Sequence, residues 1–257
     1  MLTMDVRAEM RQLFERLSAW LGPAVGLPED DAEIDYAAAV AVVDAAGRSL
    51  DRIAQRGGAE LPSGVLAEVQ ALHELERRLT ALQLDRSGDS LRSLTRVLPR
   101  LESATSSVPE LVALAPQLIC ELGFDRGLIS RVTDNVWHPE LMYVMGDPEW
   151  AATILEAGKT DPLELVPGLH EYELARTGQA ILVTEAQSRR DGTWGHPGMV
   201  QASRTHSYVA APILSDGRLV GILHGDRYGQ RRDVDELDRD LLAAFARASA
   251  WCSAGPS

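Results

Sequence analysis

The feature that most constrains the fold of this chain is a pair of apolar runs, residues 208–214 and 219–224, separated by Ser215-Asp216-Gly217-Arg218. Asp-Gly favours a two-residue turn in which both residues have positive φ, and such a turn joins two antiparallel strands. The second run ends at His224-Gly225-Asp226, and a helical pattern with an acidic first turn follows it. The sequence therefore predicts a β-hairpin followed by a helix.

Helices and strands alternate through the rest of the second half of the chain. The hydrophobic pattern predicts helices at 108–122, 149–157 and 170–177, strands at 124–132, 136–144 and 180–183, and a last helix that Asp233 or Asp235 caps and that runs to Trp251. Pro139 inside the second strand suits an edge strand or a β-bulge. Residues 185–203 are polar and lack periodicity, so we expect a long loop that is functional or mobile.

This order predicts an α+β fold with an antiparallel sheet, helices on one of its faces and long connections on the other. A pocket is expected between the sheet and the connections. The chain is predicted to divide into a helical region at 1–105, the α+β domain at 106–252 and a short tail at 253–257.

The first hundred residues have only helical spacing. Helices are expected at 5–21, 31–56, 63–84 and 90–104, with a turn at Arg86-Ser87-Gly88-Asp89 in which Asp89 caps the fourth helix. The third helix repeats its apolar residues near every 3.5 positions, which is typical of both a dimer seam and an internal bundle. Both interpretations of the N-terminal region stay open.

Composition excludes several classes of protein. A net charge of −13 argues against nucleic-acid binding by this chain alone, because phosphate neutralisation requires a basic face. No apolar run approaches the roughly 18 residues of a membrane span, and the charged N-terminus has no signal-peptide pattern. Cys120 and Cys252 both lie in amphipathic helical patterns, so we expect buried free thiols and a cytoplasmic protein.

A set of short stretches carries a family resemblance. They are SYVAAPI (207–213) and VGILHGDRY (220–228), together with LGFDR (122–126), LISRV (128–132), VWHPE (136–140), VP (166–167), HEYELAR (170–176), ILV (181–183) and VDELDRDLL (234–242). Residues 108–251 thereby resemble a GAF domain, and in particular the GAF-type sensor half of actinobacterial LuxR-type transcription regulators.

The resemblance implies a GAF-like antiparallel sheet flanked by helices and a small-molecule-responsive regulatory domain. Such a domain is usually a homodimer that controls an attached output. In those regulators a helix-turn-helix domain follows the GAF domain, whereas six residues follow Trp251 here. We therefore expect either a truncated sensor or a stand-alone one, and no direct contact of this chain with DNA.

Eight polar, aromatic and sulfur-containing residues are predicted to line the pocket and bind an unidentified small molecule, because ligand pockets are largely apolar with a few convergent polar groups. They are Trp137, Tyr143, Trp150, Trp194, His196, Met199, Arg204 and Tyr208. The alternative is that Trp137 and Trp150 are ordinary core residues and that the loop with Trp194 covers no cavity.

A second cluster is His224 and Asp226, which alternate on one strand and share a face, with His206 on the strand beside them. They are interpreted as structural, with His224 hydrogen-bonded to a backbone or carboxylate partner and Asp226 paired to Arg227 or Arg204. No metal-site spacing and no nucleophile motif occurs, so no metal, cofactor or enzymatic activity is expected.

Three functions are compared. In the first, a ligand orders residues 185–203 and thereby shifts the populations of two arrangements of the helices at 108–122 and 235–251. The alternative is a ligand-free dimerisation or interaction module whose pocket is filled by its own side chains. The third, least favoured, is a small-molecule enzyme.

Overall fold

The computed structural model describes residues 4–21, 36–55, 65–104, 108–186, 194–228 and 233–253. The chain divides into two compact units, Met1–Arg86 and Ser87–Ser257. The division falls inside a helix. It lies upstream of residue 105, which is the boundary predicted from the sequence. Among the described residues, no helix is both long enough and apolar enough to cross a lipid bilayer.

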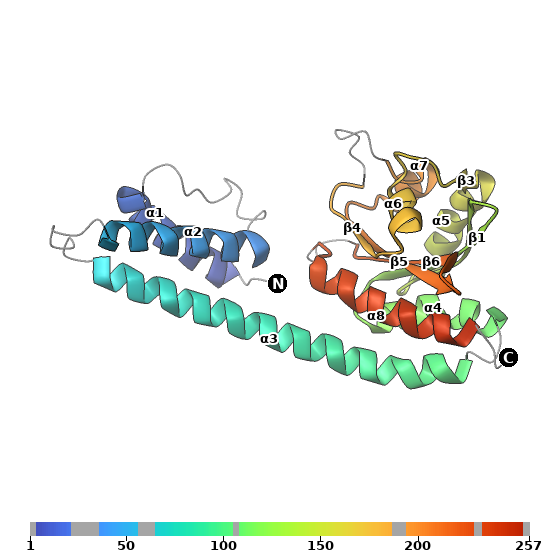
Figure 1. The fold of residues 1–257 in the computed structure, drawn as a ribbon, viewed down its shortest axis with the longest axis horizontal. Helices are drawn as coiled ribbons and strands as arrows, with labels where there is room; N and C mark the ends of the chain where they lie inside the picture. The colour runs from blue at the N-terminus through green and yellow to red at the C-terminus, as the bar shows by residue number, and fades with distance from the viewer. Residues whose placement is uncertain are drawn as a thin grey trace. The chain divides into compact units, whose positions relative to one another are not determined.

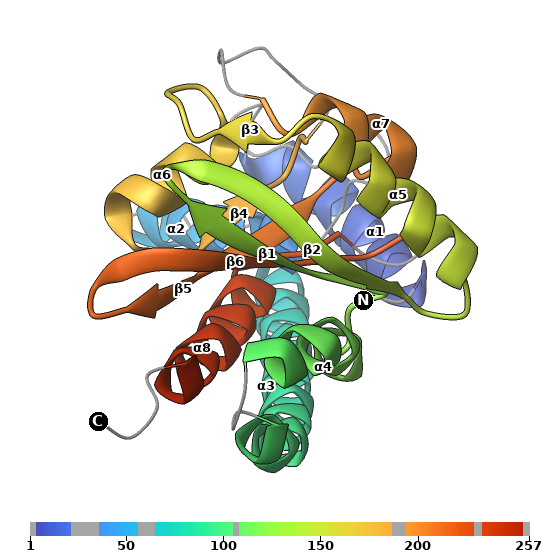
Figure 2. The ribbon, with the colours of Figure 1, turned by 90° about the vertical axis from the view of Figure 1, so that its right-hand side faces the viewer.

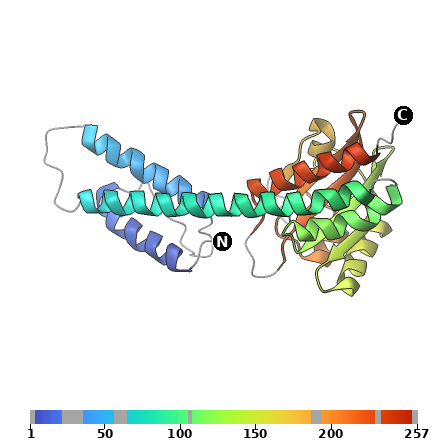
Figure 3. The same cartoon turned by 90° about the horizontal axis from the view of Figure 1, so that it is seen from below.

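The described part of the first unit is entirely helical, as expected. It contains α1 (Met4–Leu21), α2 (Tyr36–Gln55) and the N-terminal part of α3 (Val65–Ala104). Figure 3 shows α1 and α2 lying along this part of α3. One apolar stripe from each helix meets in a common core, which contains Met10, Leu13, Leu17, Val43, Leu72, Leu75 and Leu79. These stripes repeat at helical spacing, so burial of apolar surface explains the packing.

α3 is continuous, and the turn predicted at Arg86-Ser87-Gly88-Asp89 is wrong. Gly88 costs about 1 kcal/mol in a helix, and a cost of that size does not end a helix that is anchored at both ends. Asp89 lies inside the helix and pairs with Arg92 one turn later instead of capping a helix. Beyond this point Val97 and Leu101 are fully buried in the core of the second unit.

The second unit is built on one antiparallel sheet in the order β3-β2-β1-β6-β5-β4. Its strands are β1 (Arg126–Thr133), β2 (Val136–Val144), β3 (Leu163–Glu164), β4 (Ile181–Val183), β5 (Tyr208–Ser215) and β6 (Arg218–Asp226). The predicted hairpin is β5–β6, with φ of 50° at Asp216 and 75° at Gly217. Both values lie in the left-handed region that this type of turn requires. The α+β fold is confirmed.

Both faces of the sheet are covered by helices (Figures 1 and 2). One face carries α4 (Val108–Glu121), α8 (Glu236–Ser253) and the C-terminal part of α3. The other carries α5 (Pro148–Thr160), α6 (His170–Thr177) and α7 (Pro197–Ser203). The connections on this second face therefore contain more helix than the sequence analysis expected. At Gly127 of β1 an added Cβ would lie 2.3 Å from the Pro116 carbonyl oxygen, so glycine permits α4 to pack closely.

Side chains alternate between the two faces along the central strands. On β5 and β6, Val209 and Leu223 enter the core beneath α4 and α8. Their neighbours Ala210 and Ile222 enter the core beneath α5, α6 and α7. β6 therefore contributes to both cores at once.

A β-bulge interrupts the pairing of β2 with β1, as Pro139 suggested. Ile129 pairs with Leu141 while the next residue, Ser130, pairs with Pro139, so Glu140 is the extra residue. Before the bulge, Trp137 faces the core under α5, α6 and α7; after it, Met142 and Val144 do. The inward positions thus change from odd to even numbers.

Two helix starts depend on side-chain caps. Asp235 caps α8, because its Oδ1 accepts from the backbone N–H groups of Leu237 and Asp238 at 3.1 and 3.2 Å. His196 caps α7, because its Nδ1 accepts from Met199 N at 3.3 Å, and Pro197 follows at the first helical position. α7 replaces part of the loop predicted at 185–203, of which residues 187–193 lie outside the described part. Ser253, predicted to begin the tail, belongs to α8. Residues 254–257 of the predicted tail also lie outside the described part of the chain.

Candidate functional site

A cavity of about 60 Å³ lies between the sheet and the helices α5, α6 and α7. One water needs about 10 to 15 Å³ of such space, so the cavity has room for about four to six water-sized groups. Its apolar wall includes Leu128, Met142, Ile154, Met199 and Val200. Its polar lining includes Arg126, Trp137, Glu171, Thr205, Tyr208, His224 and Asp226.

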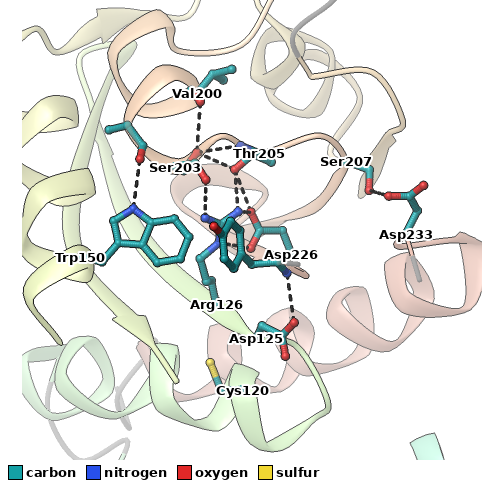
Figure 4. A network of polar contacts seen from close by, with 12 residues as sticks. Cys120, Asp125, Arg126, Trp150, Val200, Ser203, Thr205, Ser207, Asp226 and Asp233 are labelled. Atoms are coloured by element: carbon teal, nitrogen blue, oxygen red, sulfur yellow. Dashed lines mark hydrogen bonds and ion pairs between the residues drawn. The ribbon is translucent and has the colours of Figure 1, made fainter. Parts of the chain in front are cut away.

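The first polar group is a buried ion pair between Arg126, the first residue of β1, and Asp226, the last residue of β6 (Figure 4). Arg126 Nε and Nη2 donate to the two carboxylate oxygens of Asp226, each at 2.6 Å. Nη1 donates to the Ser203 carbonyl at 2.7 Å, and Nη2 also donates to Thr205 Oγ1 at 2.9 Å. These bonds attach the C-terminus of α7 to the sheet.

Every side-chain nitrogen and oxygen of the ion pair has a hydrogen-bond partner among its neighbours. The Arg126 guanidinium lies 4.9 Å from the centroid of the Trp150 ring, on α5, and the Trp150 indole N–H donates to the Ala202 carbonyl at 3.0 Å. Thr205 donates a further hydrogen bond to Asp226 at 2.9 Å. Burial raises the pKa of the Asp226 carboxyl, against the opposing charge and hydrogen bonds of Arg126. The group connects five segments of the domain.

The second polar group centres on Glu171 of α6, which is 1% exposed. Its Oε1 accepts hydrogen bonds from the Tyr208 hydroxyl at 2.8 Å and from His224 Nε2 at 3.2 Å. Burial acts to raise the pKa of Glu171, but the hydrogen bonds and charge of His224, with the Tyr208 bond, bring it below the ordinary value. Burial and the same carboxylate raise the pKa of Tyr208 well above its ordinary value.

Three atoms of this second group have no hydrogen-bond partner among the described residues. They are Trp137 Nε1, Glu171 Oε2 and His224 Nδ1, all buried and all on side chains that line the cavity. The Trp137 and His224 rings are stacked with centroids 5.2 Å apart. Each buried polar atom without a partner costs about 1 to 3 kcal/mol. The lining therefore offers unused hydrogen-bonding capacity to whatever occupies the cavity.

The structure places four of the eight predicted residues, Trp137, His196, Met199 and Tyr208, around this cavity. Tyr143 does not line it and is 38% exposed. Strict alternation from Trp137 would point Tyr143 inward, but the bulge at Glu140 reverses the alternation before that position.

The other three predicted residues lie behind or outside the cavity. Trp150 stacks on Arg126 and does not line the cavity. Trp194 and Arg204 line a separate hollow of about 380 Å³ with Pro197, Val200 and Gln201. Arg204 ends α7 with a φ of 53°, and the residue is exposed.

The residues around His224 differ in part from the expectation. His224 has a carboxylate partner, Glu171, as anticipated. The predicted partners of Asp226 are wrong, because it pairs with Arg126 while Arg227 pairs with Asp238 of α8. His206 is exposed and precedes β5 rather than lying on it. His224 and Asp226 also line the cavity, which the structural interpretation had not anticipated.

Arg126 and Glu171 are not among the site residues predicted from the sequence. The signal for Arg126 was a lone cation at the start of one buried strand, matched by the lone carboxylate Asp226 at the end of another. No such signal marked Glu171, because Glu173 stands two positions away in the same helix and is exposed.

Metal and thiol chemistry find no support among the described residues. No cluster there of three or more His, Cys, Asp or Glu side chains has the arrangement of a metal site. Cys120 is a buried free thiol. Burial, with smaller effects from the charges of Asp226, Asp125 and Glu121, raises its pKa to about 12, so it is a poor nucleophile. The side chain of Cys252 lies outside the described part.

Comparison with known proteins identifies the fold. The sequence profile of the GAF domain family matches residues 115–252. The GAF domain of a phosphoenolpyruvate-protein phosphotransferase from Coxiella burnetii superposes with a TM-score of 0.50 at 15% identity, over 64% of this chain and 92% of that one. No curated protein sequence matches significantly.

Two further solved structures superpose less well. A free methionine-R-sulfoxide reductase from Neisseria meningitidis, in complex with its substrate, gives a TM-score of 0.45 at 18% identity, over 62% of this chain and 87% of that one. A GAF domain/HD domain protein from Geobacter sulfurreducens gives 0.44 at 18% identity, over 59% and 97%. At these identities the likeness concerns the fold and not the chemistry.

Proposed function

The chain belongs to the GAF domain family, a common small-molecule-sensing module of regulators and signalling proteins, and we propose that it senses a small molecule in the cavity described above. The observation that carries the proposal is the contrast between the two polar groups of the lining. In the Arg126–Asp226 group every side-chain nitrogen and oxygen has a hydrogen-bond partner within the domain. The Glu171 group leaves three buried atoms open. Buried polar atoms in folded proteins nearly always have a hydrogen-bond partner, and a bound molecule would supply one to these three.

We propose that ligand binding on one face of the sheet is transmitted through the sheet to the helices on its opposite face. α7 lines the cavity with Met199 and Val200, and its C-terminus is attached to Arg126. β6 faces the cavity with His224 and the opposite core with Leu223. A ligand that fits one position of α7 better than another shifts the populations of the two, and α4 and α8 respond on the far face. Couplings of this kind amount to about 1 to 3 kcal/mol.

The output and assembly are parts of the same proposal. We propose that the output is control of transcription in a cytoplasmic regulator of the LuxR type, and that this chain binds its ligand without transforming it. We also propose a homodimer. Leu84 and Leu91 lie seven residues apart on α3 and are 67% and 64% exposed, the spacing of a coiled-coil seam. Direct DNA contact is not part of the proposal, since the net charge is −13.

The sensing function is tested by screening small metabolites of all charge classes for thermal stabilisation of the full chain. A binder raises the melting temperature by mass action. The matched variant is Ile154→Phe, which fills the cavity from α5 and is expected to abolish the stabilisation. If no compound stabilises the wild-type chain, the ligand-free interaction module is the better explanation.

The assembly is tested separately by light scattering on Leu91→Glu. A homodimer through α3 is expected to dissociate, because the substitution places like charges opposite each other in the seam. Val108→Glu, a change at another exposed apolar residue, is the control and should leave the mass unchanged. A monomeric wild-type chain would refute the dimer without affecting the sensing proposal.

A further inference from the structure

The two polar groups that face the cavity differ in how their charged side chains are neutralised. Arg126 and Asp226 neutralise each other through two hydrogen bonds of 2.6 Å. Although burial raises the pKa of Glu171, the hydrogen bonds from His224 and Tyr208 help to bring it below the ordinary value, so Glu171 is also ionised. One of its oxygens accepts two hydrogen bonds and the other, Oε2, accepts none from the described residues. The acceptor that remains available in the cavity is therefore a buried carboxylate oxygen, Glu171 Oε2.

When no ligand is bound, His224 is the group that can neutralise the negative charge of Glu171. A carboxylate only accepts hydrogen bonds, so His224 Nε2 must donate to Glu171 Oε1. The remaining nitrogen, Nδ1, then either carries a second proton or presents a lone pair. In the first case His224 supplies the positive charge that Glu171 requires. In the second, the site lacks one positive charge and has two acceptors, Oε2 and Nδ1, without donors.

The rest of the lining specifies the shape of the missing group. Trp137 Nε1–H has no acceptor among the described residues, so the occupant needs a hydrogen-bond acceptor as well as donors. The rings of Trp137, Tyr208 and His224 stand close together, with centroids 5.2 and 5.7 Å apart for the pairs that include His224. Aromatic faces attract a cation. An anion, in contrast, would meet the buried carboxylate directly.

From these features we infer that the cavity recognises a small protonated amine that also carries a hydroxyl or carbonyl oxygen. The ammonium group donates to Glu171 Oε2 and to the neutral His224 Nδ1, and the oxygen accepts from Trp137 Nε1–H. The carbon skeleton lies against Leu128, Met142 and Ile154. The cavity holds about four to six non-hydrogen atoms of such a molecule. This inference rests on the proposed sensing function and specifies its ligand class.

The test uses three probes of nearly equal size with the full chain at pH 7: ethanolamine, which is cationic, ethylene glycol, which is neutral, and glycolate, which is anionic. Each is added at about 50 mM with ionic strength equalised by sodium chloride. The readouts are the melting temperature and the indole N–H resonance of Trp137, assigned by its loss in Trp137→Phe. Ethanolamine is expected to raise the melting temperature by about 2 °C or more and to move that resonance. The other two probes should do neither.

α6 offers a matched pair of variants. Glu171→Gln keeps the shape of the side chain and an oxygen for Tyr208 and His224, but removes the charge; it should abolish the response to ethanolamine. Glu173→Gln removes an exposed charge two residues away and should retain the full response. If Glu171→Gln does not fold, the comparison of the three probes on the wild-type chain still decides the matter. Trp137→Phe adds a second test, because it removes the N–H donor to the ligand oxygen and should therefore weaken the response to ethanolamine.

The outcomes separate the ligand class from the function. A response to glycolate at least as large as that to ethanolamine, or an undiminished response in Glu171→Gln, overturns the inference. A second outcome also overturns the inference about the ligand class. In this outcome ethanolamine does not stabilise the chain, whereas neutral or anionic compounds of the wider screen do, and their effect is lost in Ile154→Phe. The sensing function would then remain supported. If no compound of any charge stabilises the chain, the sensing function itself fails.

Discussion

Replacing Arg126 by Met tests whether the buried ion pair holds α7 to the sheet. Arg126 is 1% exposed and makes four hydrogen bonds, to both Asp226 oxygens, the Ser203 carbonyl and Thr205. Met has a similar length but no charge, so the variant leaves the Asp226 carboxylate buried with Thr205 as its remaining donor from this group. Breaking a buried pair in this way costs about 3 to 5 kcal/mol.

The double variant Arg126→Met/Asp226→Leu separates the pair from its surroundings. Replacing both charges by apolar groups is often neutral or stabilising. The Ser203 carbonyl still loses its donor in both variants, at a cost of about 1 to 3 kcal/mol. We therefore expect the double variant to lie within about 2 kcal/mol of the wild type and to be clearly more stable than the single variant.

The measurement is urea-induced unfolding at pH 7, followed by tryptophan fluorescence and circular dichroism on the same samples, because the chain has two compact units and the two signals need not coincide. In the single variant an unpaired Asp226 has a raised pKa in the folded state, so its penalty should shrink as the pH is lowered from 7 to 5. A loss below about 1 kcal/mol in Arg126→Met, or a double variant as unstable as the single one, would refute the reasoning.

Three further predictions concern other parts of the second unit. Although burial raises the pKa of Glu171, hydrogen bonds bring it below its ordinary value of 4.5, so its ionised form stabilises the fold above that pH and the stabilisation is lost as the pH falls through the lowered value. Glu171→Gln should make melting temperatures between pH 6 and pH 3 decline less steeply, and an unchanged slope would contradict this. In Cys252→Ser, Ellman's reagent at pH 8 should label Cys120 only in urea, because a pKa of about 12 leaves about one thiolate in ten thousand; rapid labelling of the folded chain would be the opposite result. Asp235→Ala should lower the stability by about 1 kcal/mol and the melting temperature by about 2 to 4 °C, since it removes both bonds of the α8 cap, whereas an unchanged value would show that the cap is dispensable.

Elements with their own local signals could be predicted from the sequence. The turn at Asp216-Gly217 fixes β5 and β6, and Gly178, with a φ of 66°, ends α6 where expected. α3 and α7 could not be predicted as they are. In α3 the turn signal at Ser87-Gly88 is weaker than the burial of the helix on either side. In α7 the cap is a histidine, a residue type that rarely announces a helix.

The residues of the site also differ in whether they could be predicted from the sequence. Large residues such as Trp137 and Tyr208 could be found because ligand pockets favour them. The charged residues could not, since their meaning depends on partners distant in the chain. Arg126 and Asp226 face each other only once β1 and β6 are known to be neighbours in register. Glu171 and Glu173 look alike in sequence, and only the packing of α6 on the sheet decides which of them is buried.

The extra residue in β2 has a consequence for how such a pocket changes over time. Glu140 belongs to neither ladder register, and it is the reason that Trp137 and Met142, five positions apart, both reach the cavity. Loss of the codon for Glu140 would remove the bulge and leave a regular strand in which Trp137 and Met142, then four positions apart, still face the cavity while Tyr143 still faces out. The bulge thus lets the strand lose one residue at this point without any exchange of the residues that line the cavity.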